Sequence, residues 1–240
     1  MNSIPVAMIP ELELDRKTET GSKLLVQTLP QIERGINLVE ADPDLPVFQI
    51  LLSRELSSGK AFWIDQGDQA STFRMSRVGG ENFLRDIMVS RSYTPYQHYT
   101  SVMEAEEFLE DAEVMVMPSI NLMYEDQLKE KEREDLFGEM MQRIDRYAAE
   151  YGLKVLTSLS DRVPGSLEFR IRARAEKTVE AEKTCQGLKF ESEGFSSQIY
   201  RSNGKIQTTV PLFTNSTFKG EVEIVGKNEQ DLQAAPGAVL

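Results

Sequence analysis

Short apolar runs recur along the middle of the chain, and segments with helix-like spacing separate them. The runs predict buried strands at residues 35–41, 61–65, 87–91, 112–118 and 153–159. Strands that are apolar on both faces and alternate with helices are typical of a parallel sheet that helices cover on both sides. The pattern therefore predicts an α/β fold.

The segments between these runs predict helices at residues 45–56, 101–109 and 130–151. In the first of them Val47, Ile50 and Leu51 share one helical face, and Asp44 stands just upstream as a candidate N-cap. Gly152 is expected to end the long third helix, because glycine adopts the left-handed conformation at helix C-termini without strain.

Beyond Pro164-Gly165 the pattern changes to strict alternation. Residues 167–175 alternate apolar and basic side chains, which predicts a half-exposed strand. Similar strands are predicted at 195–201, 205–213 and 218–225, and Asn203-Gly204 is a strong hairpin signal. We therefore expect an antiparallel extension at one edge of a mostly parallel sheet.

The ends of the chain differ from its middle. Residues 1–23 carry little periodicity and predict a flexible arm, and residues 227–240 predict a disordered tail. Residues 24–226 are expected to form a single core domain.

Composition narrows the function classes. Among the 240 residues, 27 Lys and Arg face 39 Asp and Glu, which gives a net charge of −12. A surface of this sign disfavours non-specific nucleic-acid binding unless the cations cluster. One cysteine, Cys185, excludes an internal disulfide and a cysteine-built zinc site, and one histidine, His98, excludes a multi-histidine metal site. No apolar stretch suits a membrane span or signal peptide, so a cytoplasmic protein is expected.

The loop after the first strand, where an α/β fold would bind phosphate, has the wrong chemistry. A phosphate loop needs glycines, free amides and a lysine. The segment Glu40-Ala41-Asp42-Pro43-Asp44-Leu45-Pro46 has neither glycine nor lysine, carries three carboxylates, and loses two amides to proline. The Gly59-Lys60 pair lies where a helix gives way to a strand, so its amides would point away from any phosphate. Binding of ATP in the usual way is not expected.

Four further segments stand in a fixed order between residues 62 and 159. They are FWID followed by TFR at 72–74 with Arg77, DIMVSRSYTPYQHYTSV at 86–102, AEVMVMPSINLMYED at 112–126, and EMMQRIDRYAAEYGLKVLTSL at 139–159. Together they resemble the ATPase core of archaeal RadA and related recombinases of the RecA family. The resemblance implies a RecA-like fold: a mostly parallel sheet with helices on both faces and an antiparallel C-terminal edge.

The departures from this family fall on its catalytic positions. Its phosphate loop corresponds to residues 41–46, which include Ala41, Asp42, Pro43 and Asp44. Pro118 stands in place of the family's magnesium-associated aspartate, and Asp68 is the nearest substitute for the catalytic glutamate. The resemblance thus implies a RadA paralog with a degenerate phosphate loop, no cofactor and no hydrolysis. Were a nucleotide and magnesium bound at all, Asp65, Asp68 and Ser119 would surround them.

The family's two DNA-binding loops correspond to residues 126–135 and 160–167, which are short here. The densest basic cluster is Arg162 with Arg170, Arg172 and Arg174, of which the last three would lie on one face of the predicted strand. Residues two apart on a strand are about 7 Å apart, close to the spacing of phosphates along DNA. The alternative is a solvated face whose arginines pair with neighbouring acids.

The leading hypothesis is a non-catalytic RecA/RadA-like accessory or regulatory factor in homologous recombination or DNA repair. Its expected partner is a RadA-type recombinase or another RecA-fold protomer, including a second copy, with single-stranded DNA as an additional ligand. The alternatives are a pseudo-ATPase signalling scaffold unrelated to DNA and a divergent active ATPase. His98 is expected to be a packing residue, and Cys185 a small buried or half-buried one.

Overall fold

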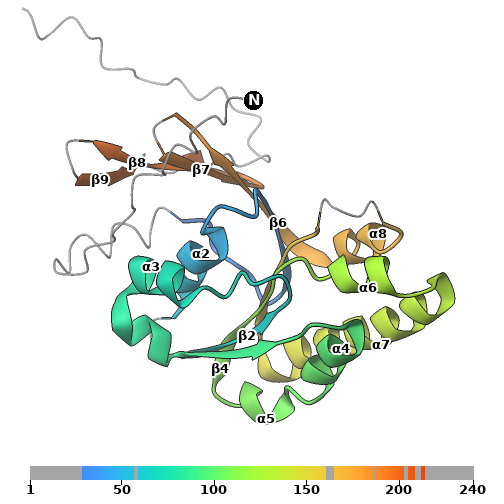
Figure 1. Ribbon diagram of the computed structural model, residues 1–240. Coiled ribbons are helices and arrows are strands. Elements are labelled where there is room, and N and C mark those ends of the chain that lie inside the picture. The colour runs from blue at the N-terminus through green and yellow to red at the C-terminus, as the bar shows by residue number, and fades with distance from the viewer. Residues whose placement is uncertain are drawn as a thin grey trace, which may run out of the picture.

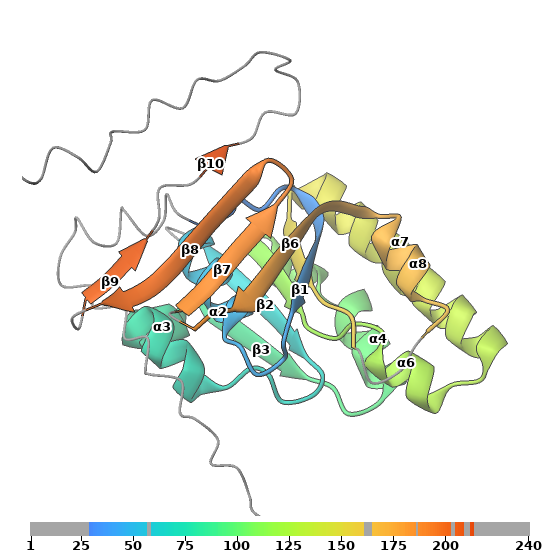
Figure 2. The same ribbon diagram turned by 90° about the horizontal axis from the view of Figure 1, so that it is seen from above.

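The computed structural model describes residues 29–56, 59–160, 165–185, 187–202, 205–208 and 212–213. Its strands are β1 Gly35–Ala41, β2 Lys60–Asp65, β3 Ile87–Arg91, β4 Ala112–Met117, β5 Lys154–Thr157, β6 Ala175–Lys183, β7 Gly187–Ser192, β8 Phe195–Ser202, β9 Lys205–Thr208 and β10 Leu212–Phe213. Within this part of the chain they form one sheet in the order β10-β8-β7-β6-β1-β5-β4-β2-β3, with β9 paired to β8 (Figure 2).

The sheet has a parallel half and an antiparallel edge. Strand β1 pairs in parallel with both β5 and β6, β4 with β5 and β2, and β2 with β3. Strands β7 to β10 add antiparallel pairings beyond β6. The predicted α/β class, the mostly parallel sheet and the antiparallel C-terminal edge are confirmed.

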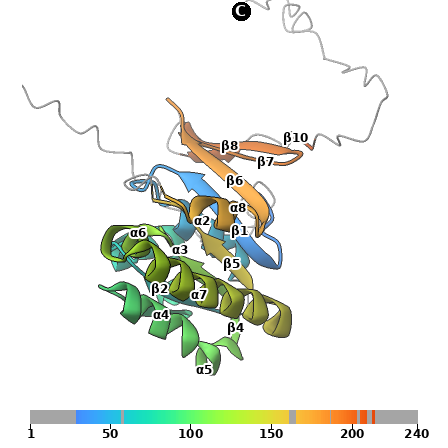
Figure 3. The same cartoon turned by 90° about the vertical axis from the view of Figure 1, so that its right-hand side faces the viewer.

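The helices are α2 Val47–Glu55, α3 Thr72–Arg85, α4 Pro95–Met103, α5 Glu106–Leu109, α6 Leu122–Gln127, α7 Glu130–Tyr151 and α8 Glu168–Arg172. They cover both faces of the sheet, as Figures 1 and 3 show. Helices α2 and α3 share one buried cluster with Trp63 and Val116, and α4 to α8 share another with Phe62 and Met115. Neighbouring residues of one strand thus enter opposite cores, which explains the near-continuous apolar runs.

Local sequence signals account for three of the helix ends. Helix α7 ends at Gly152, whose φ of +65° is the expected left-handed C-cap. Ser71 caps α3 by accepting a hydrogen bond from Arg74 N, and Thr94 caps α4 in the same way. Asp44 was predicted to cap α2, but the N-cap is Pro46 and no side chain caps it. The carboxylate of the preceding aspartate, Asp42, instead accepts the Asp44 amide.

The segment after residue 165 is the largest departure from the predicted elements. Residues 167–175 were expected to be a strand, but they form helix α8 and only then enter β6. Leu167 and Ile171 are buried, whereas Phe169 is 79% exposed. The side chains that enter the core are therefore four residues apart, and this helical spacing overrides the local alternation.

Other predicted elements change in extent. The helix expected at 101–109 begins earlier, at Pro95, and is interrupted between α4 and α5. Helices α3 and α6 and strand β7 were not predicted, and of β6 only Ala175 fell within a predicted strand. The N-terminal arm, the tail, Asn203-Gly204 and the strand at 218–225 lie outside the described residues; Ser202 nonetheless pairs with Lys205 across the expected hairpin. Of the helices in the described ranges, none combines the length and the apolarity that crossing a membrane requires.

Candidate functional site

A cavity of about 230 Å³ lies at the carboxyl ends of β1, β2, β4 and β5. The chain leaves β1 for α2 on one face of the sheet, whereas it leaves the neighbouring β5 for α8 on the other face. Connections that diverge in this way open a crevice at the strand ends, the usual ligand position in open α/β sheets. The cavity therefore occupies the position where a ligand of this fold class is expected.

One wall of the cavity is the loop after β1, which includes Ala41, Asp42, Pro43 and Asp44. Its amides serve the loop itself: Asp44 N donates to Asp42 Oδ1 at 2.8 Å, and Leu45 N donates to the Asp42 carbonyl at 3.0 Å. Prolines 43 and 46 have no N–H to offer. The loop thus presents carboxylates where a phosphate site needs free amides.

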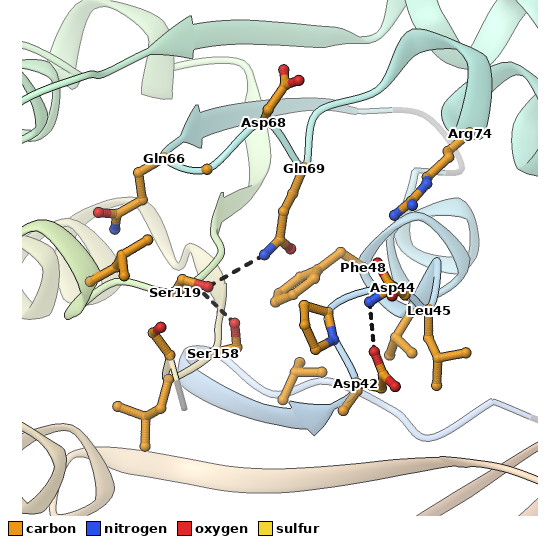
Figure 4. A pocket seen from close by; sticks show the side chains of 18 residues that line it. Asp42, Asp44, Leu45, Phe48, Gln66, Asp68, Gln69, Arg74, Ser119 and Ser158 are labelled. Carbon is orange, nitrogen blue, oxygen red and sulfur yellow. Dashed lines mark hydrogen bonds between the residues drawn. The ribbon is translucent and has the colours of Figure 1, made fainter. Parts of the chain in front are cut away.

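A second wall is the turn between β2 and α3. Gly67 and Asp68 adopt positive φ angles of +102° and +60°, and Asp65 Oδ1 accepts the Gln69 amide at 3.0 Å, which closes the turn. The Asp68 carboxylate turns away from Ser119 (Figure 4) and pairs with Arg91 at 3.6 Å. A non-glycine residue at positive φ costs free energy that the surrounding structure must offset.

Asp65 is a buried carboxylate next to the cavity rather than part of its lining. Its side chain is 1% exposed, Arg91 Nε lies 4.0 Å from Oδ2, and within the described residues Oδ2 accepts no hydrogen bond. Burial raises the pKa of Asp65, although the amides that bind it and Arg91 act in the opposite direction. The folded chain therefore holds a proton on Asp65 more tightly than the unfolded chain does.

Replacing Asp65 with asparagine is expected to change how stability depends on pH. The raised pKa stabilises the folded chain fully below the ordinary value of 3.8, and this contribution is lost as pH rises through the folded value. Asparagine keeps the acceptor for Gln69 and cannot ionise. Urea midpoints measured from pH 4 upward should therefore show D65N gaining on the wild type as pH rises, and parallel curves would contradict the assignment.

The third wall joins the ends of β4 and β5. Ser119 N donates to Ser158 Oγ at 2.9 Å, and Gln69 Nε2 donates to Ser119 Oγ at 3.3 Å (Figure 4). Gln49 of α2 in turn binds the Gln69 carbonyl. Ser119 has a φ of +54°. Hydrogen bonds thus tie three strand ends and α2 into one braced cavity.

The residues predicted to surround a magnesium nucleotide do not form one group. Ser119 and Asp68 both line the cavity, but the Asp68 carboxylate pairs with Arg91, and Asp65 lies beside the lining. No cluster of three or more histidine, cysteine or acidic side chains in the described ranges has a geometry suited to a metal ion. The hypothesis of a divergent active ATPase gains no geometric support from these side chains.

Two side chains of the site, Arg74 and Ser158, were not predicted to belong to it. Arg74 extends from α3 toward the side of the cavity where Asp44 and Phe48 lie (Figure 4). Arg74 lies in the first turn of α3, beyond the turn that follows β2, and its sequence position alone did not place its side chain in the cavity. Ser158 follows the carboxyl end of β5.

The predicted basic cluster has a different geometry from the one expected. Arg170 and Arg172 lie on helix α8 and Arg174 follows it, so the spacing along a strand does not apply. Arg170 pairs with Glu134 at 3.3 Å, and Arg172 pairs with both Glu40 and Glu168. Arg174 pairs with Asp145 at 3.2 Å. Arg162 lies outside the described residues. The arginines thus match the alternative of a solvated face paired with acids.

The predicted packing role is confirmed for His98, and the predicted burial is wrong for Cys185. His98 is fully buried between Tyr124 and Gln66, and burial lowers its pKa to about 3, so it stays neutral and packs as predicted. Cys185 was expected to be buried or half-buried but is exposed, in the turn between β6 and β7.

Comparisons with known proteins identify no relative of the chain. No protein-family model matches the chain, and no curated protein is significantly similar to it in sequence.

Proposed function

We propose that the chain is a non-catalytic RecA/RadA-like paralog, an accessory or regulatory factor in homologous recombination or DNA repair that acts by contacting a RadA-type recombinase. The observation that carries the proposal is the loop after β1. It occupies the ligand crevice of the sheet, yet its amides are internally bonded and its side chains are acidic.

The fold supports the proposal through the placement of the resembling segments. FWID ends β2, TFR opens α3, the segment at 86–102 spans β3 and α4, and AEVMVM forms β4. The last segment covers the end of α7 and all of β5. The layers and the antiparallel edge are consistent with those that the resemblance implies, and this agreement supports the proposal.

The site argues against phosphoryl transfer. That chemistry depends chiefly on positioning the phosphates and neutralising their charge. Here Asp42 and Asp44 line the crevice, and Arg74 is the single basic side chain in the lining. Repulsion between these carboxylates and a triphosphate opposes binding, which supports the proposal of a role without ATP hydrolysis.

The charges around α8 favour protein contact over contact with DNA. Three guanidiniums face four carboxylates there, those of Glu40, Glu134, Asp145 and Glu168. A phosphate would have to displace these acids and would still meet excess negative charge. The same observation favours the second candidate function, a pseudo-ATPase scaffold unrelated to DNA.

The proposal is tested by pull-down with the host's recombinase and by DNA strand-exchange assays. We expect direct contact and a changed exchange rate, together with no heat of binding when Mg-ATP is titrated into the chain. Failure to contact the recombinase and to affect exchange would contradict the proposal and favour the scaffold.

A second assay addresses DNA. Fluorescence anisotropy with a labelled oligonucleotide at low and high salt should show at most weak binding, and a R170Q/R172Q/R174Q variant should change it little. Tight, steeply salt-dependent binding that this variant abolishes would show that the paired arginines release their acids to bind phosphate.

A further inference from the structure

The cavity holds charges of both signs that are not paired with each other. Asp42 and Asp44 belong to the loop after β1, and Arg74 to helix α3. Within the described residues none of these three side chains forms an ion pair, whereas Asp68, which also lines the cavity but is 85% exposed, pairs with Arg91 at 3.6 Å. The uncompensated charges of the lining are therefore two carboxylates and one guanidinium.

Polar and apolar groups complete the lining. Ser119 and Ser158 are each 8% exposed, and their hydroxyl oxygens accept bonds from Gln69 and from Ser119 N. Each hydroxyl thus keeps its own proton to donate, and no acceptor for it is found among the described residues. The apolar part of the lining consists of Val39, Leu45, Val47, Phe48, Leu122 and Leu159.

The size of the cavity limits the ligand. Its volume of about 230 Å³ is below the roughly 300–1,000 Å³ typical of pockets for drug-sized molecules. The hydrogen bonds among Gln49, Gln69, Ser119 and Ser158 brace the walls before any ligand binds. A braced small cavity with a few convergent polar groups suits a small metabolite.

We propose that this cavity binds a small zwitterion of amino-acid size, with its ammonium group at Asp42 and Asp44 and its carboxylate at Arg74. A ligand of this class satisfies both kinds of unpaired charge. A phosphate ester meets two carboxylates, a plain cation meets the guanidinium, and an uncharged ligand gains no ionic contact with the exposed Asp42 and Asp44 or with the half-buried Arg74. The inference does not depend on the proposed recombinase partner.

Binding is detected first by thermal shift, with each of the twenty standard L-amino acids as the probe. A ligand that binds only the folded chain raises Tm by mass action. Tryptophan fluorescence gives a second readout, because the single tryptophan, Trp63, packs on Phe48 of the cavity wall at a centroid distance of 6.1 Å. We expect at least one amino acid to give both signals, and the absence of a shift with all twenty overturns the proposal.

Blocked derivatives then test the polarity of binding by titration calorimetry. The N-acetyl and the carboxamide forms of the bound amino acid should each bind at least about tenfold more weakly, because each loses a charge-assisted hydrogen bond. Equal affinity for the free and the blocked forms would overturn the assignment of a zwitterion.

Variants assign each end of the ligand to its residues. R74Q should weaken binding of the free amino acid at least about tenfold but change binding of its carboxamide little. D42N and D44N should likewise weaken binding of the free amino acid but change binding of its N-acetyl form little. R85Q on the same helix, at an exposed position outside the cavity, and the exposed E104Q serve as charge-matched controls. An effect of R74Q that is equal for both ligand forms overturns the proposed contact.

Discussion

Alanine at Glu125 is expected to lower the free energy of unfolding by about 3 kcal/mol, because it leaves two buried donors without an acceptor. Glu125 Oε2 accepts Asn121 Nδ2 at 2.8 Å, and Oε1 accepts the Leu167 amide at 3.1 Å. An orphaned buried donor costs about 1–3 kcal/mol. The residue is 9% exposed, so water would not fully replace the carboxylate.

The same carboxylate lies against the described residues at the α8 end of the connection between β5 and α8. Gly165 packs against it so closely that a Cβ at that position would lie 1.4 Å from Glu125 Oε1, and Asn121 Oδ1 accepts the Ser160 amide at the other end of the connection. Loss of Glu125 should therefore also speed proteolysis between residues 160 and 167. Urea denaturation and limited proteolysis measure the two effects.

The control for Glu125 is its neighbour. Asp126 lies on the same helix and carries the same charge, but it is exposed. D126A should change stability by no more than about 0.5 kcal/mol. Similar losses in E125A and D126A would show that net charge, rather than the buried hydrogen bonds, accounts for the effect.

The strands of the parallel half could be predicted because their signal is local. Strands β1 and β3 have the bounds that their apolar runs predicted. Strand β1 is buried on both faces, as expected of a central parallel strand, whereas β3 lies at the edge of the sheet and is only partly buried. Strand β6 escaped notice because it is mostly polar; Val179 and Ala181 are its buried residues. Its place between β1 and β7 comes from pairing across the sheet, which its own residues do not encode.

The helices that sequence analysis missed depend on tertiary contacts. Helix α3 contains the pair Gly79-Gly80, which disfavours a helix locally, yet Met75, Val78 and Phe83 are buried in the core shared with α2. In α8, five residues are too few to show a periodicity, so Leu167 and Ile171 were assigned to a strand. Both segments are therefore helical because of the core contacts of their buried side chains rather than because of a local sequence signal.

The candidate site was predictable only in part. The acidic, proline-containing loop after β1 follows directly from the order of residues, and its place in the crevice follows from the α/β pattern. Arg74 and Ser158 could not be assigned to it in advance, because they come from segments 84 residues apart (158 − 74) that meet only when β2 and β5 lie in one sheet. The chemistry of the ligand therefore became visible only with the fold.

Alanine at Trp63 is expected to cost about 4 kcal/mol, within the roughly 3–5 kcal/mol typical of removing a buried large aromatic side chain. Trp63 is fully buried on β2 and contacts Phe48 edge to face, with ring planes 61° apart. Native domains are stable by only about 5–15 kcal/mol, so W63A should melt far below the wild type. Far-UV circular dichroism in urea measures the loss without a tryptophan signal.

Two further variants separate packing from polarity at this position. Trp63 Nε1 finds no hydrogen-bond partner among the described residues, so W63F removes an unpaired donor together with part of the ring. The free energy of unfolding should therefore fall much less in W63F than in W63A. F169A truncates an aromatic side chain that is 79% exposed and should change stability by no more than about 0.5 kcal/mol. A loss in F169A as large as that in W63A would contradict the burial assigned to both residues, and with it the packed wall that Phe48 contributes to the cavity.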